Sequence, residues 1–115
     1  MIAVIFEVFP KEGKQERYLE IAGELRSQLE KVDGFISVER FQSLTDPKKI
    51  LSISFFEDEE ALMTWRNLSL HRKGQAEGRN ELFDDYRIRV AQVLRDYGMF
   101  ERDEVPQDSL EVHTS

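Results

Sequence analysis

The spacing of apolar positions changes several times along the chain, and the first segment is the most apolar. Residues 2–9 are apolar at nearly every position and are rich in β-branched and aromatic side chains. A half-exposed strand would alternate, so this segment predicts a strand that is covered on both faces. Pro10 ends the strand, and residues 11–14 form the predicted turn.

From Lys14 onward, apolar residues recur at intervals of three and four positions, which predicts an amphipathic helix. Asp33 and Gly34 end this helix, because glycine suits the left-handed position that follows a helix. The predicted buried stripe consists of Tyr18, Ile21, Ala22, Leu25, Leu29 and Val32.

The middle of the chain predicts an antiparallel hairpin made of residues 35–44 and 49–56. The polar turn between them contains Pro47, whose fixed φ angle suits a turn corner. In the second of these strands, apolar and small polar residues alternate. One face carries Leu51, Ile53 and Phe55, and the other carries Ser52 and Ser54.

A second helix is predicted to begin after Asp58, which is a preferred capping residue. Acidic residues follow in the first turn, where the helix dipole favours them. The apolar face of this helix consists of Ala61, Leu62, Trp65 and Leu68, and Ser69 is predicted to cap a short continuation.

The last predicted elements are a connector over residues 80–85, a fourth strand and a tail. Tyr86, Ile88 and Val90 alternate with Arg87, Arg89 and Ala91, which predicts the strand. Polar residues dominate the end of the chain. We therefore expect one domain over residues 1–97 and a polar C-terminal tail over residues 98–115.

The element order is β-α-β-β-α-β, which predicts an α+β, ferredoxin-like fold. In this fold a four-stranded antiparallel sheet carries two main helices on one face. Because the first strand is apolar on both faces, we expect a second copy of the chain to cover the other face, as in a homodimer. The alternative is a monomer with one exposed apolar face.

Composition narrows the possible chemistry. The 115 residues include 16 Lys and Arg, 23 Asp and Glu, two His and no Cys, with a net charge of -7. The lack of cysteine excludes a thiol nucleophile, a disulfide and a Cys-ligated metal. The acidic balance opposes nucleic-acid binding. No apolar run is long enough for a signal core or a membrane span, so we expect a cytoplasmic protein.

Several segments resemble the antibiotic biosynthesis monooxygenase (ABM) family of small dimeric α+β barrel proteins. The resemblance extends over residues 2–97, and the segments that carry it are Gly34 and Phe35, residues 56–62, residues 65–67, His71, Gly78 and Arg79, and residues 86–88. Members of this family include oxygenases that need no cofactor, enzymes that act on quinols, haem-degrading enzymes and proteins without known activity. The resemblance implies a monooxygenase that acts on a small aromatic or quinol-type molecule without a metal or other cofactor.

This activity would need an apolar pocket, which we expect between the second helix and the sheet, and polar groups around the substrate. Trp65 is the candidate for stacking on an aromatic ring. Asn67 and His71 lie four residues apart, hence on one helical face if the helix continues, and a neutral His71 can accept a proton. The candidates for holding a substrate oxygen are Arg72, Tyr86 and Arg87.

Each candidate also has a purely structural explanation. Trp65 can fill the core, Asn67 can end the helix, and His71 can be exposed or act as a cap. Tyr86 can be packed, and Arg87 can pair with an acidic residue of its own chain or of a partner. These explanations favour a non-catalytic, dimeric protein that binds a small ligand as the alternative function.

Haem degradation is a third and disfavoured hypothesis. The haem-degrading members have an Asn near the end of the first strand, where this chain has Glu7. Their haem-ligating His also follows the Trp at a longer distance than His71 follows Trp65, and Gln75 lies nearer that position.

Overall fold

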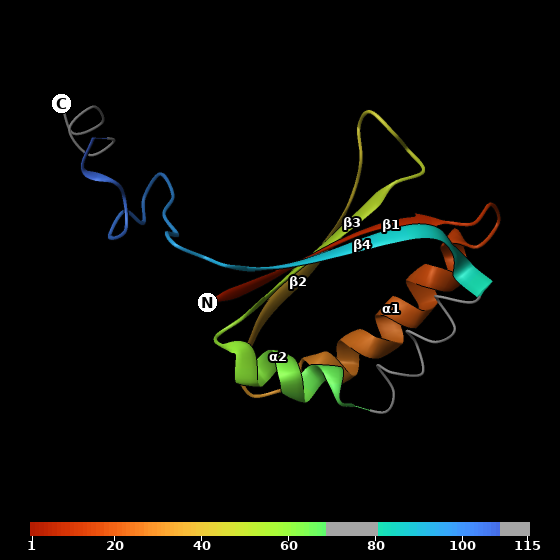
Figure 1. Ribbon diagram of the computed structural model, residues 1–115, viewed down its shortest axis with the longest axis horizontal. Helices are drawn as coiled ribbons and strands as arrows, with labels where there is room; N and C mark the ends of the chain where they lie inside the picture. The colour runs from red at the N-terminus through yellow and green to blue at the C-terminus, as the bar shows by residue number, and fades with distance from the viewer. Residues whose placement is uncertain (69–80, 109–115) are drawn as a thin grey trace.

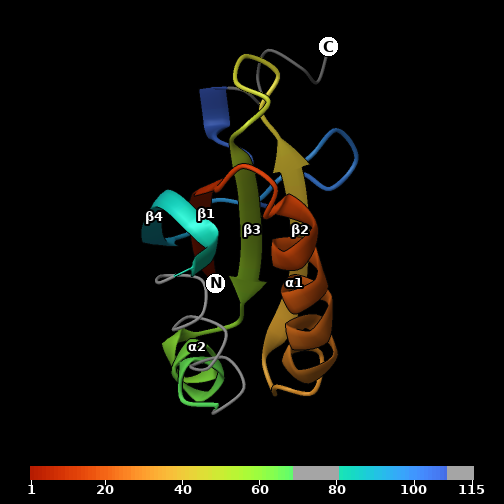
Figure 2. The same cartoon turned by 90° about the vertical axis from the view of Figure 1, so that its right-hand side faces the viewer.

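A computed structural model describes residues 1–68 and 81–108. The elements, in chain order, are β1 (Ile2–Pro10), α1 (Gln15–Leu29), β2 (Phe35–Gln42), β3 (Ile50–Phe56), α2 (Glu59–Arg66) and β4 (Phe83–Gln92). The strands form one antiparallel sheet in the order β2-β3-β1-β4. Both helices lie on the same face of this sheet (Figures 1 and 2). The predicted ferredoxin-like arrangement is confirmed.

Helix α1 ends at Leu29, four residues before the predicted end. The chain tightens there, because the amides of Lys31 and Val32 donate to the carbonyl oxygens of Gln28 and Leu29, only three residues back. Val32 is nevertheless buried, with 9% of its surface exposed. The apolar stripe therefore continues through a turn that is no longer α-helical.

Strand β4 begins at Phe83, so the prediction of a connector over residues 80–85 was wrong for its second half. The long strand β1 provides the pairing partner, with Phe83 opposite Pro10 and Asp85 opposite Phe9. The Phe83 ring also makes edge-to-face contacts with Phe6 and Tyr18. Pairing and packing here outweigh the low strand propensity of two consecutive aspartates.

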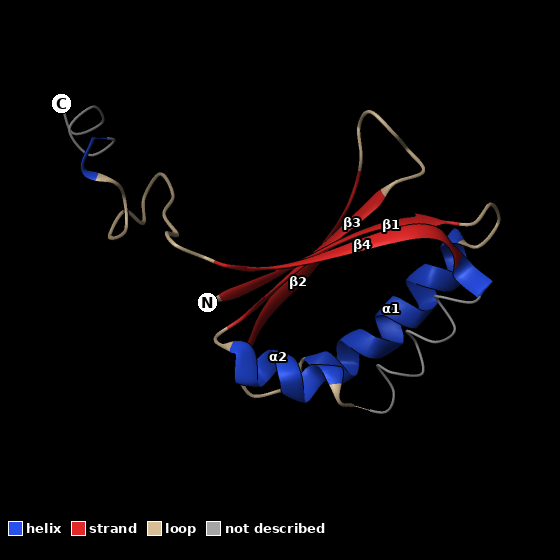
Figure 3. Ribbon diagram, in the orientation of Figure 1, coloured by secondary structure: helices blue, strands red, loops and turns tan. Residues whose placement is uncertain are grey.

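Side chains alternate between the two faces of the sheet, and the central strand β1 is apolar on both. Ile2, Val4, Phe6 and Val8 face the helices and contribute to the core. The opposite face, which we call the open face, carries no helix of the described residues (Figure 3). Its apolar side chains are Ile5, Phe9, Phe41, Leu51, Ile53 and Phe55.

A charged cluster lies within the open face. The carboxylate of Glu7 accepts from Arg89 at 3.0 Å and pairs with Lys49 Nζ at 3.2 Å. These two cations, Arg89 foremost, hold the pKa of Glu7 below its usual range. The carboxylate therefore stays ionised at neutral pH among apolar neighbours.

After β4 the chain leaves the sheet as an extended arm, residues 93–108 (Figure 1). The amide of Val93 still donates to the carbonyl oxygen of Met1 at 3.0 Å. Beyond it, large apolar side chains are exposed, namely Leu94 at 80%, Met99 at 80% and Phe100 at 92%. Within the described residues, no helix is long and apolar enough to span a membrane.

Gly34 directly precedes β2 and lies beside the residue that follows β3. Its φ angle is +88°, which lies in the left-handed region that favours glycine. Its carbonyl oxygen accepts from the amide of Glu57 at 2.7 Å. A Cβ atom at this position would lie 2.8 Å from the Cβ of Ala61 in α2. The absence of a side chain here lets α2 pack closely against the sheet.

We expect Gly34→Ala to lower the free energy of unfolding by about 1–3 kcal/mol, because it combines a strained φ angle with a steric clash. Gly23→Ala is the matched control. Gly23 lies inside α1, nothing lies within 4 Å of an added Cβ, and its φ angle is not positive. Gly23→Ala should raise the free energy of unfolding by about 0.5–1 kcal/mol. Urea denaturation of both variants measures the difference, and an equal midpoint for Gly34→Ala and the wild type would contradict the prediction.

Candidate functional site

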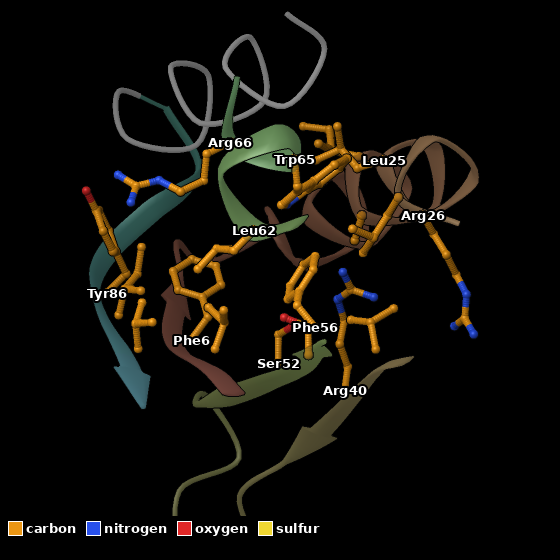
Figure 4. Close-up of a pocket in the computed structure, with 18 of the residues that line it drawn as sticks. Phe6, Leu25, Arg26, Arg40, Ser52, Phe56, Leu62, Trp65, Arg66 and Tyr86 are labelled. Atoms are coloured by element: carbon orange, nitrogen blue, oxygen red, sulfur yellow. The ribbon is translucent and has the colours of Figure 1, made fainter. Parts of the chain in front are cut away.

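A cavity of about 380 Å³ lies between the helices and the sheet (Figure 4). This volume falls within the range of small-molecule sites, which is about 300–1,000 Å³. Both helices supply its roof, whereas the sequence predicted a pocket against the second helix alone. The roof residues are Tyr18, Ile21, Ala22, Leu25, Arg26 and Leu29 from α1 and Leu62, Trp65 and Arg66 from α2.

The sheet supplies the floor of the cavity as rows of paired residues. One row runs Arg40, Ser52, Phe6 and Ile88, and the next runs Val38, Ser54, Val4 and Val90, from β2 across β3 and β1 to β4. The polar side chains therefore lie on the β2–β3 half of the floor. The β1–β4 half is apolar in both rows, so the floor has a polar end and an apolar end.

Arg40 is the cation at the polar end. Its side chain extends from β2 toward the cavity beside Phe56 and Ser52 (Figure 4). The Nε atom is buried and has no hydrogen-bond partner among the described residues, and the same is true of Tyr18 Oη in the roof. Burying such groups unpaired costs free energy, so both are candidates for contact with a bound molecule.

Two further arginines border the cavity in different settings. The side chain of Arg26 points away from the cavity, and its Nε atom lies 3.2 Å from Glu30 Oε1. Arg66 is exposed and extends toward Tyr86, on the side opposite Arg40 (Figure 4). Neither places its charge at the polar end of the floor.

Helix α2 places Trp65 in the roof. Asp58 caps the helix, with its Oδ1 atom accepting from the amide of Ala61 at 2.9 Å. Trp65 follows Leu62 on the buried face, and only 8% of its surface is exposed. It belongs both to the main core cluster, with Leu62 and Phe56, and to the cavity wall.

The structure brings two of the predicted site residues together at the cavity, Trp65 and Tyr86. Asn67 is the C-terminal cap of α2 and does not line the cavity. Arg87 pairs with Glu7 in the sheet register, which places it on the open face. His71 and Arg72 lie outside the described residues.

The sequence analysis did not single out the polar end of the floor. Ser52 and Ser54 were recognised as one face of their strand, but the pattern of β3 alone does not say which face meets the helices. Arg40 stood in a strand in which half of the residues are polar or charged without a strict alternation. Only the pairing of Arg40 with Ser52 and of Ser52 with Phe6 links these residues to the cavity.

A family model and a curated relative both relate this chain to antibiotic biosynthesis monooxygenases. A family model described as antibiotic biosynthesis monooxygenase matches residues 1–77. A protein of Pyricularia oryzae named jasmonate monooxygenase ABM is 45% identical over 93 residues, which cover 81% of this chain. The same alignment covers 43% of that protein, so the chain spans less than half the length of this curated relative.

Solved structures share the fold at low identity. Rv0793 from Mycobacterium tuberculosis matches with a TM-score of 0.75 and 15% identity, over 84% of this chain and 98% of that one. SO0527 from Shewanella oneidensis matches with a TM-score of 0.72 and 19% identity, over 78% of this chain and 87% of that one. These likenesses show the fold.

Because Trp65 is part of the core, we expect Trp65→Ala to lower the free energy of unfolding by about 3–5 kcal/mol. Trp65→Phe should lower the free energy of unfolding by less than Trp65→Ala, because it keeps an aromatic ring in the same space. Urea denaturation followed by far-ultraviolet circular dichroism measures both variants without relying on tryptophan fluorescence. An unchanged midpoint for Trp65→Ala would show that the indole contributes to the cavity wall and not to the core.

Proposed function

The chain belongs to the antibiotic biosynthesis monooxygenase family, and we propose that it is a monooxygenase that oxidises a small, flat, mostly apolar molecule in the cavity beneath α1 and α2. The observation that carries this proposal is the cavity itself, with Trp65 in its roof and an apolar half-floor. A molecule of the quinol or anthrone type suits such walls, because its ring can stack on the indole.

For an anthrone-type substrate the reaction needs no external electron donor. The substrate CH₂ group loses both hydrogens and becomes a carbonyl group. One atom of O₂ enters that carbonyl, and the other leaves as water together with the two hydrogens. The substrate therefore supplies all four electrons that reduce O₂, and the protein has to bind it, promote its anion and exclude bulk water.

His71 is our candidate for accepting the substrate proton. Asn67 caps α2 outside the cavity lining, so we assign it no direct contact with the substrate anion. Arg72 and Tyr86 remain the candidates for holding a substrate oxygen, whereas Arg87 lies on the open face, away from this cavity. Tyr86 is supported by its position in the cavity wall. The described wall residues include no Asp, Glu or His, so the proposed base comes from the segment that contains His71.

Non-catalytic binding of a small ligand is the second candidate function. The same feature favours it, because the described wall offers a binding surface without an obvious proton acceptor. This candidate predicts that aromatic molecules raise the melting temperature but are not converted.

We also propose that the chain forms a homodimer through the open face. This face presents apolar side chains around the ion cluster of Glu7, and large exposed apolar faces are uncommon in monomers. The exposed Leu94, Met99 and Phe100 of the arm support the same assembly, because the described part of their own chain leaves them largely exposed.

Oxygen uptake tests the enzymatic proposal. We expect uptake to rise above the uncatalysed rate with at least one member of a panel of anthrones and quinols. His71→Ala should reduce the rate about a hundredfold or more, as expected for loss of a general base. His113→Ala, which removes the other histidine of the sequence, is the matched control and should keep the wild-type rate.

The name of the relative from Pyricularia oryzae adds jasmonic acid to the panel. Hydroxylating one of its C–H bonds consumes two electrons that the substrate does not supply. The assay with jasmonic acid is therefore run with and without a reduced nicotinamide. Stabilisation by ligands without uptake across the whole panel would favour the binding function instead.

Sedimentation at micromolar concentration tests the dimer, and the wild type should show about twice the chain mass. We expect Ile53→Asp to give a folded monomer, because it places a charge in the apolar open face. Met63→Asp is the control, since Met63 is 59% exposed on α2 and lies on the helical side of the sheet. A monomeric wild type would contradict the proposal.

A further inference from the structure

We infer that the substrate is an apolar molecule carrying a carboxylate group, and that Arg40 binds this carboxylate at the polar end of the cavity. The inference rests on the proposed use of the cavity and names the chemical class of its occupant. It also assigns to Arg40 a role in substrate specificity.

The first step is the electrostatic state of Arg40. An arginine side chain stays protonated in proteins, so it cannot escape burial by losing its charge. The Nε atom of Arg40 is buried without a partner, and no carboxylate of the described residues pairs with the guanidinium. A cation that borders an apolar cavity in this way is stabilised when an anion enters.

The second step is the position of Arg40 in the floor. Ser52 lies directly opposite it on β3, and 8% of the Ser52 surface is exposed. Across the same row lie Phe6 and Ile88, which are apolar. An occupant of this floor is therefore polar at one end and apolar over the rest of its length.

The third step is the kind of anion. The guanidinium presents its donors as a planar fork, which matches the two oxygens of a carboxylate. One carboxylate balances one guanidinium, whereas a doubly charged phosphate would leave a negative charge in the apolar cavity. The Ser52 hydroxyl, as the neighbouring group, adds a donor for the same oxygens.

The other two arginines of the cavity are less suited to this role. Arg26 is already paired with Glu30 and points away from the cavity. Arg66 is exposed at the opposite side, where water screens its charge.

Calorimetric titration with a matched pair of probes tests the inference. Hydrocinnamic acid and hydrocinnamyl alcohol share the phenyl ring and the chain and differ in the terminal group. We expect the wild type to bind the acid about ten- to a hundredfold more tightly than the alcohol, as charge-assisted hydrogen bonds predict. Arg40→Met should lose this preference and keep its affinity for the alcohol.

Arg26→Met is the matched control. It also removes an arginine from the cavity lining, but the guanidinium of Arg26 points away from the cavity. This variant should keep the preference for the acid. Thermal melts of the ligand-free proteins establish that Arg40→Met is folded, and we expect a melting temperature equal to or above that of the wild type, because an unpaired charge is removed.

The inference would be overturned by equal affinity of the wild type for acid and alcohol, by no binding of either probe at millimolar concentration, or by retention of the acid preference in Arg40→Met. Loss of the preference in Arg66→Met alone would place the anion at the other side of the cavity and would also overturn it. The titration does not depend on turnover. Acid preference without oxygen uptake contradicts only the proposed activity, and uptake without acid preference contradicts only the role of Arg40.

Discussion

The register of β1 between β3 and β4 determines which side chains face the helices, and the rest of the structure depends on it. With Phe6 opposite Ser52 and Ile88, the even-numbered residues of β1 face the helices and the odd-numbered ones the open face. A slip of β1 by one residue would turn Glu7 toward α1 and α2, away from Arg89 and Lys49. The ion cluster of Glu7 with Arg89 of β4 and with Lys49, which directly precedes β3, lies on the open face and would be lost in such a slip.

Much of this fold could be predicted from the sequence, because each element carries a strong local signal. The stripe of α1 was predicted in full, and even Val32 is buried although the helix has ended. The start of β4 was missed because the local sequence of residues 83–85 has no pattern typical of a strand. Phe83 and Asp85 become strand residues only through their pairing with the end of β1. Local patterns specify elements, whereas long-range pairing sets their ends.

The candidate site could be predicted only where its residues lie on the apolar face of an element. Trp65 and Tyr86 were recognisable because apolar periodicity marks positions that face the interior. Arg40 carries no such mark, since a charged residue in a half-polar strand is usually exposed to solvent. Its position in the cavity follows from the pairing of β2 with β3 and from the side of β3 that meets the helices. Neither relation is visible in any single segment of the chain.

The cavity, the open face and Arg40 each limit the stability of the isolated, ligand-free chain. A chain of this size buries only about two-thirds of the surface that it exposes when unfolded. A cavity of about 380 Å³ reduces the packing that remains on the helical side. The apolar side chains of the open face offer further burial in the proposed homodimer. A cation in the cavity wall that pairs with no carboxylate of the described residues lowers the stability of the empty protein further. Dimerisation and ligand binding would therefore each contribute stability that the isolated, empty chain lacks, and Arg40 makes the second contribution depend on the charge of the ligand.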